Sequence, residues 1–166
     1  MNSDKKLCHG LYPGSFDPIT YGHIDIVRRF APFFNKLTVL TASSIHKTYW
    51  FSLEERTQMA REVLKDFSNV TVDSHTGLTV DYARQKGIVA IIRGLRSTSD
   101  FPYERDIAIN NKKMYPALET FLVFSETGQE VISAKLIKEI ATHGGNLADL
   151  VPAQVQQKIE DKLKNM

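Results

Sequence analysis

The fold is decided by the stretch LCHGLYPGSFDPITYGH, residues 7–23. Leu7 to Tyr12 is a short apolar-rich run that stops at Pro13-Gly14, which predicts a strand followed by a turn. From Gly22 to Phe34 the apolar residues recur three or four positions apart, which predicts a helix that Pro32 kinks or ends early. A strand, a tight loop and a helix in this order begin a βαβ unit.

The rest of the chain repeats this alternation of short apolar runs and longer amphipathic runs. Further strands are predicted at residues 37–42, 70–73, 88–92 and 120–124, and further helices at residues 52–67, 80–86, 103–114, 133–143 and 152–164. Such an order predicts an α/β, Rossmann-like nucleotide-binding fold, in which a parallel sheet has helices on both faces. Because no linker or repeat divides the sequence, we expect a single domain over residues 1–166.

The composition excludes several classes of protein. The 166 residues are 42% hydrophobic and 24% charged, which is typical of a globular domain, and the net charge of +2 is too balanced for general nucleic-acid binding. No apolar run approaches the ~18 residues of a membrane span, and the polar start at Met1 to Lys6 lacks the apolar core of a signal peptide. We therefore expect a cytoplasmic protein, and the single cysteine, Cys8, fits a reducing compartment. No metal site is predicted, because no metal-ligand spacing links His9, His75 and His143.

In parallel sheets, ligands bind beyond the carboxyl ends of the strands, so the loop after the first strand is the first place to search for a site. Two glycines and two prolines make this loop tight, and it runs directly into a helix whose free N–H groups suit a phosphate. Gly22 lets a ligand approach the backbone, and His23 would direct an imidazole to the same place. The alternative is a connecting loop with a solvated histidine.

Cationic side chains follow two other predicted strands. Lys47 comes after the second strand, where a mobile ammonium could bridge two phosphates, although a lysine in a loop is usually only solvated. Arg93 and Arg96 flank Gly94-Leu95 after the fourth strand, and their guanidinium groups suit phosphate oxygens unless they are simply exposed. Ser133 is a natural N-cap for the helix that follows it.

The first loop resembles a known signature. Gly14-Ser15-Phe16-Asp17-Pro18, followed by Thr20-x-Gly22-His23, is similar to the T/H-x-G-H motif with which the nucleotidyltransferase superfamily cradles ATP phosphates. The segment from Arg93 to Glu104 resembles the corresponding segment of the phosphopantetheine adenylyltransferase family. That resemblance extends to three further segments and so to nearly the whole chain. These segments are Leu53 to Arg56, Gly77 to Ala83 and Leu136 to Glu139.

The resemblance implies transfer of the adenylyl group of ATP to 4′-phosphopantetheine, which gives dephospho-coenzyme A and pyrophosphate. His23 and Lys47 would be the catalytic residues. The acceptor would be bound by Ser15, Lys47, Thr79 and Arg93. ATP would be bound by Ser15, Phe16, His23, Gly94, Leu95, Arg96, Glu104, Gln129, Glu130, Val131, Ile132, Ser133, Ala134 and Lys135. Within this set, Arg96 and the Ser133 helix start would receive the leaving pyrophosphate, and Glu104 with residues 129–132 would line the nucleoside pocket.

The resemblance also implies the partners. They are ATP, 4′-phosphopantetheine, dephospho-coenzyme A or coenzyme A, and Mg²⁺ held mainly by the ATP phosphates. The assembly would be a homohexamer. We expect no nucleic-acid partner and no membrane partner. The chain departs from the family at Ala134 and Lys135, where the family has two further hydroxyl residues. Lys135 either offers charge to a β- or γ-phosphate or extends into solvent.

Two other functions are compatible with the same motifs. One is a sister enzyme such as a nicotinamide mononucleotide adenylyltransferase, which would share the phosphate-binding residues and differ in its acceptor. The other is a non-catalytic regulatory subunit that binds a nucleotide or coenzyme. Pyrophosphate release with each acceptor in turn would separate the three.

Overall fold

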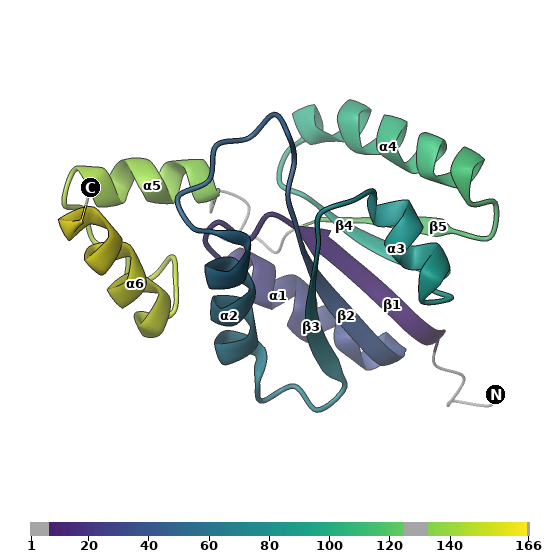
Figure 1. The fold of residues 1–166 in the computed structure, drawn as a ribbon, viewed down its shortest axis with the longest axis horizontal. Coiled ribbons are helices and arrows are strands. Elements are labelled where there is room, and N and C mark those ends of the chain that lie inside the picture. The colour runs from purple at the N-terminus through teal and green to yellow at the C-terminus, as the bar shows by residue number, and fades with distance from the viewer. Residues whose placement is uncertain (1–6, 125–132, 166) are drawn as a thin grey trace.

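A computed structural model describes residues 7–124 and 133–165. The strands of these residues are β1 (Leu7–Gly14), β2 (Phe34–Ala42), β3 (Val70–His75), β4 (Ala90–Leu95) and β5 (Glu119–Phe124). The α-helices are α1 (Tyr21–Phe30), α2 (Leu53–Leu64), α3 (Thr79–Gln85), α4 (Phe101–Met114), α5 (Ala134–Thr142) and α6 (Ala153–Lys164). The strands form one parallel sheet in the order β3-β2-β1-β4-β5, as Figure 1 shows.

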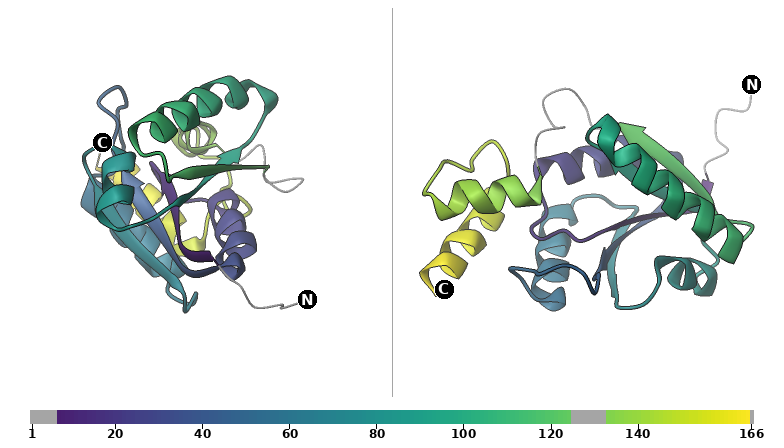
Figure 2. Two further views of the ribbon diagram at one scale, coloured as in Figure 1. Left: turned by 90° about the vertical axis from the view of Figure 1, so that its right-hand side faces the viewer. Right: turned by 90° about the horizontal axis from the view of Figure 1, so that it is seen from above.

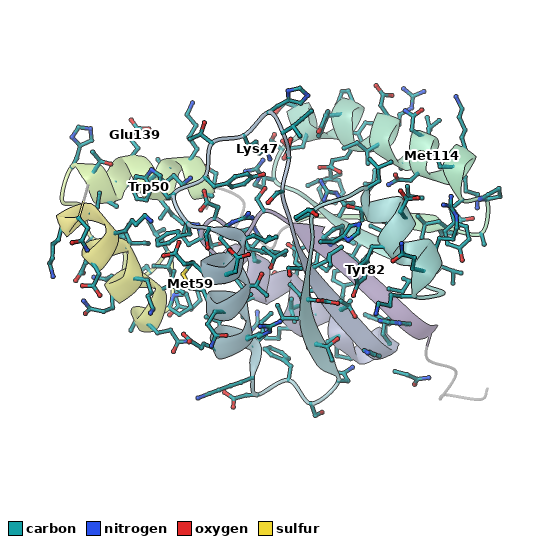
Figure 3. All side chains as sticks on the ribbon, viewed as in Figure 1. Lys47, Trp50, Met59, Tyr82, Met114 and Glu139 are labelled. Carbon is teal, nitrogen blue, oxygen red and sulfur yellow. The ribbon has the colours of Figure 1, made fainter. Side chains whose placement is uncertain are left out.

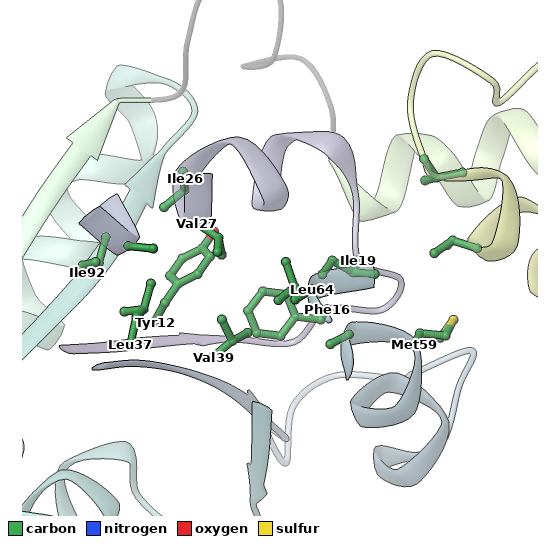
Figure 4. Close-up of a cluster of buried hydrophobic side chains, with 14 of the residues drawn as sticks. Tyr12, Phe16, Ile19, Ile26, Val27, Leu37, Val39, Met59, Leu64 and Ile92 are labelled. Atoms are coloured by element: carbon green, nitrogen blue, oxygen red, sulfur yellow. The ribbon is translucent and has the colours of Figure 1, made fainter. Parts of the chain in front are cut away.

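Successive residues of a strand point to opposite sides of the sheet, so both faces carry apolar side chains, and helices cover both. On one face, α1 and α2 pack on strand residues such as Val39 and Ile92 (Figure 4). On the other face, α3 packs on residues such as Leu40 and Ile91. Arg93 shares the face of Ile91 and pairs with Glu104 of α4, so α4 lies on the α3 side. This arrangement confirms the α/β fold with helices on both faces, and Figure 2 gives two further views of it.

The order of the strands reverses between β1 and β4. From β1 the chain continues to β2 and β3 in one direction, whereas β4 and β5 lie on the opposite side of β1. The carboxyl ends of β1 at Gly14 and of β4 at Leu95 therefore flank a topological switch point, which is where open α/β sheets bind ligands. The predicted first loop and the Arg93–Arg96 segment meet at this point.

The C-terminal helices extend the core beyond the sheet. Buried residues of α5 and α6, among them Ile137, Val155 and Ile159, belong to the same apolar cluster as Met59 of α2. Figure 1 shows this helix pair beyond α2. None of the helices in the part of the chain that the structure describes is long and apolar enough to cross a membrane.

Several predicted elements differ from the structure in their bounds, and two of them are instructive. The helix predicted from residue 22 towards residue 34, with Pro32 predicted to kink or end it early, ends at Phe30: a short 3₁₀ turn around Pro32 follows, and Phe34 already begins β2. The strand predicted at residues 88–92 lies at 90–95. The reason is that Gly87, with φ of 62°, ends α3 and the N–H of Ile88 donates back to the helix at Ala83. Arg93 is therefore inside β4 and not after it.

Candidate active site

The start of α1 fixes the imidazole of His23. Thr20 caps this helix, and its backbone N–H donates to Nδ1 of His23 over 3.1 Å, while the N–H of His23 faces the Thr20 hydroxyl at 3.4 Å. Because a backbone N–H can only donate, Nδ1 is an unprotonated acceptor, and the neutral ring carries its proton on Nε2. The helix cap thus selects the tautomer that offers an Nε2–H donor.

The surroundings of His23 keep this ring uncharged. Burial lowers its pKa to about 4, and the positive charge of Arg96 acts in the same direction. The ring of Phe16 meets the imidazole edge-on, with 5.0 Å between the ring centroids. At neutral pH His23 is therefore a hydrogen-bond donor that carries no charge.

The stability of the protein should fall as the pH drops from about 6.5 to about 4, because of His23. In this window the unfolded chain protonates His23 and the folded chain does not, whereas above it the stabilisation is constant. Urea unfolding of the parent and of His23→Asn at about pH 7.5 and about pH 5 measures the effect. The parent should lose more stability than the variant, and an equal loss would mean that the folded histidine titrates normally.

Phe16 packs against this histidine and is part of the core. Its side chain is 1% exposed, and its backbone has φ of 46°, a left-handed conformation that is unfavourable for an aromatic residue. A Cβ on Gly14 would lie 2.8 Å from the Phe16 ring, so the packing of that ring requires glycine there. Any contact between Phe16 and ATP would therefore come from the backbone.

Arg93 and Glu104, which the sequence assigned to different substrates, form one ion pair. Nε and one terminal nitrogen of Arg93 donate to the two carboxylate oxygens of Glu104 over 2.6 and 2.7 Å, and the other terminal nitrogen donates to the carbonyl of Pro13 over 2.9 Å. Glu104 is buried. Since a guanidinium has five N–H groups, these contacts leave two for a ligand.

The residues after Arg93 have separate roles. Leu95 is buried, and Gly94 lets α1 approach β4, because a Cβ there would lie 2.5 Å from Cδ1 of Ile26. Arg96 is exposed, and Asp100 accepts its backbone N–H over 3.0 Å. Although burial opposes ionisation, this hydrogen bond and the Arg96 charge hold the pKa of Asp100 below its ordinary value. Of residues 94–96, only Arg96 extends a polar side chain at this edge.

The other predicted residues follow the carboxyl ends of their strands. Ser15 is partly exposed after β1, Lys47 is exposed in the loop after β2 (Figure 3), and Thr79 is the first residue of α3 after β3. The hydroxyl of Ser133 accepts the N–H of Leu136 over 3.1 Å, which confirms Ser133 as the N-cap of α5. Ala134 and Lys135 are the first two residues of this helix. Gln129, Glu130, Val131 and Ile132 lie outside the described residues.

Arg56 supports this edge, and the sequence prediction missed it. Its side chain is 1% exposed and donates to the carbonyl oxygens of Ser15, Ala42 and Phe51 over 2.6, 3.0 and 3.2 Å. It also donates to the Ser43 hydroxyl over 2.7 Å. The signal that could have revealed it is its place three residues before Met59, on the apolar face of α2. Arg56 thus joins the loop after β1 to the loop after β2.

Known proteins are similar to nearly the whole of this chain. A family model described as Cytidylyltransferase-like matches residues 11–140. The chain is 48% identical to a phosphopantetheine adenylyltransferase of Dictyoglomus turgidum over 158 residues, which are 95% of this chain and 99% of that protein. A protein of the same name from Desulforudis audaxviator is 48% identical over 92% of this chain and 93% of its own length.

A solved structure shares the fold at low sequence identity. It is Plasmodium falciparum nicotinic acid mononucleotide adenylyltransferase complexed with NaAD, with a TM-score of 0.68, 14% identity and coverage of 93% of this chain and 95% of that one. This likeness supports the fold alone. The identity to the relatives over almost their full length decides the family: the chain belongs to the phosphopantetheine adenylyltransferases.

Proposed function

We propose that this protein transfers the adenylyl group of ATP to 4′-phosphopantetheine, forming dephospho-coenzyme A and pyrophosphate in the biosynthesis of coenzyme A. The observation that carries the proposal is the 48% identity to a phosphopantetheine adenylyltransferase over 95% of the chain. The geometry supports it, because donors and cations follow the strands on both sides of the switch point.

The reaction is an in-line displacement at phosphorus. A phosphate oxygen of 4′-phosphopantetheine forms a bond to the α-phosphorus of ATP, and the bond from that phosphorus to the oxygen of the leaving pyrophosphate breaks. Such transfers depend on positioning and on stabilising charge, so no side chain has to become covalently attached. The Nε2–H of His23 would donate to an α-phosphate oxygen as negative charge develops there.

The remaining residues divide between the two substrates. Lys47 would hold the acceptor phosphate against the α-phosphate, with Ser15 donating a hydroxyl to orient it. Arg93 would contact the acceptor phosphate through the two N–H groups that Glu104 and Pro13 leave free, and Thr79 would lie along the pantetheine arm. Arg96 and the start of α5 would receive the pyrophosphate, since a helix N-terminus favours an anion.

Mg²⁺ would enter this site as an ion bound to ATP. Three acidic side chains near this edge are already paired, Asp17 with Lys138, Asp100 with Arg96 and Glu104 with Arg93. Among residues 7–124 and 133–165, no group of three His, Cys, Asp or Glu side chains could hold a metal ion. An Mg²⁺ ion held by phosphates and water would draw negative charge from the phosphates.

A homohexamer in the cytoplasm completes the proposal, and sedimentation of the purified protein tests the assembly.

A pyrophosphate assay tests the proposed function. The protein should release pyrophosphate from ATP when 4′-phosphopantetheine is present, and not with nicotinamide mononucleotide or without an acceptor. Release with nicotinamide mononucleotide as the acceptor, and none with 4′-phosphopantetheine, would identify the sister activity. ATP binding without release for any acceptor would identify a regulatory subunit.

Lys135→Ala should raise the KM for ATP at low salt. At the second position of α5 an exposed ammonium opposes the helix dipole, at a cost of about 0.3–1 kcal/mol, and a β- or γ-phosphate would compensate it. The rise should shrink as salt screens the charge, while the free protein becomes slightly more stable. An unchanged KM at low salt, with the same gain in stability, would show that Lys135 only extends into solvent.

A further inference from the structure

The buried carboxylate of Asp17 joins three separate segments. One of its oxygens accepts the N–H of Phe51 over 3.0 Å, and the other accepts the N–H of Trp50 over 3.0 Å and pairs with Nζ of Lys138. Its side chain is 4% exposed, and that of Lys138 is 20% exposed. The ammonium of Lys138 also lies 5.4 Å from the centroid of the Trp50 ring. Because hydrogen bonds to a charged carboxylate are strong, Asp17 fixes Trp50, Phe51 and Lys138 relative to one another.

Each of these segments carries a residue of the proposed reaction. Asp17 lies two residues after Ser15 in the loop after β1, and Trp50 and Phe51 end the loop that carries Lys47. Lys138 lies in the second turn of α5, five residues after the Ser133 cap. The three segments are far apart in the sequence, and the Asp17–Lys138 pair is a direct side-chain link from α5 to the loops at the sheet edge.

We propose that Asp17 and Lys138 are positioning residues that fix the start of α5 relative to the two loops holding the acceptor. This inference rests on the proposed function. Neither side chain has to touch a substrate. The pair acts by holding the phosphate-binding end of α5 where the ATP phosphates meet the acceptor, and a displacement of about 1 Å in such an arrangement can cost 10²-fold in rate.

Lys138→Met tests the proposal with little disturbance of the fold. Methionine keeps an apolar side chain beside Trp50 and removes the ammonium, while the carboxylate of Asp17 keeps its two backbone donors. The variant should lose about tenfold or more in kcat/KM for ATP, with a smaller change in the KM for phosphopantetheine. Lys138→Arg, which restores the positive charge, should recover most of the loss.

Asp17→Asn and the double variant identify the partner through which Lys138 acts. If the two residues act as one pair, the double variant should be no slower than the worse single variant, because the second change removes nothing more. Losses that multiply in the double variant would overturn the pairing. Unfolding curves of each variant ensure that activity is compared at temperatures where all are folded.

Lys162→Met is the matched control. Its ammonium also lies over an aromatic ring, 5.6 Å from the centroid of Phe51, and pairs with a carboxylate, Glu55, at 3.8 Å, but it belongs to α6. It should leave kcat/KM for ATP within about twofold of the parent. An equal loss in Lys138→Met and Lys162→Met, or no loss in Lys138→Met, would refute the inference.

The parent's assay separates this inference from the proposed function. If the parent releases no pyrophosphate with 4′-phosphopantetheine, the proposed function fails, and calorimetry with ATP alone then tests the pair. Weaker ATP binding by Lys138→Met than by Lys162→Met would support the positioning of α5, and equal binding would overturn it.

Discussion

His23→Ala should lower kcat by about 10²–10³-fold, because it removes the donor that the proposed reaction directs at the charge developing on the α-phosphate. This corresponds to about 2.7–4 kcal/mol in the activation free energy. ATP should still bind, since the other phosphate contacts are unaffected. Steady-state kinetics and calorimetry with ATP measure the two effects separately, and turnover within about threefold of the parent would contradict the role.

His23→Asn distinguishes the loss of the donor from damage to the helix. Its side-chain oxygen can accept the Thr20 N–H that Nδ1 now accepts, so the cap of α1 is retained while the Nε2–H donor is lost. The kcat of this variant should therefore fall nearly as far as that of His23→Ala, although its unfolding midpoint stays closer to that of the parent. A substantial recovery of kcat in His23→Asn would mean that the cap, and not the donor, matters.

Arg56→Met should lower the free energy of unfolding by about 3–4 kcal/mol, because it leaves one buried acceptor and three partly buried acceptors without this donor. These are the carbonyls of Ser15, Ala42 and Phe51 and the Ser43 hydroxyl. Urea unfolding measures the loss. The kcat should also fall, since Ser15 and the start of the Lys47 loop lose a shared support.

Arg61→Met is the control for this variant. Arg61 is on the same helix and is exposed, so its replacement should change the free energy of unfolding by no more than about 0.5 kcal/mol. A loss in Arg56→Met no larger than the loss in Arg61→Met would show that the hydrogen bonds of Arg56 add nothing to stability.

The sequence predicts the fold well because the period of its apolar residues records which faces are buried. The alternation of runs gives the parallel sheet, and Ser133 reveals a helix start through local capping chemistry. Element ends are harder to predict, since Ile88 is apolar enough for a strand but is used to close α3. Long-range pairing decides such positions, as it does for Leu95, which pairs with Phe124 in β5.

The residues of the site are predictable only where their chemistry is local. The signature loop identifies His23, but its tautomer follows from a hydrogen bond with Thr20 that only the three-dimensional structure displays. Asp17 and Lys138 are 121 residues apart in the chain, and nothing in the sequence pattern links them. Likewise, Arg93 and Glu104 are read as separate ligands of the substrates until the structure brings them together.

The pairing of Arg93 with Glu104 makes the two cations of the proposed acceptor site thermodynamically different. The guanidinium is already held by three hydrogen bonds, so a phosphate that contacts it finds a side chain with little rotational freedom left to lose. Lys47 is exposed, and ordering such a long side chain on a ligand costs about 0.5–1.5 kcal/mol of conformational entropy. In the proposed reaction Arg93 would thus offer the acceptor a rigid template, whereas the contact with Lys47 would form only against an entropic penalty.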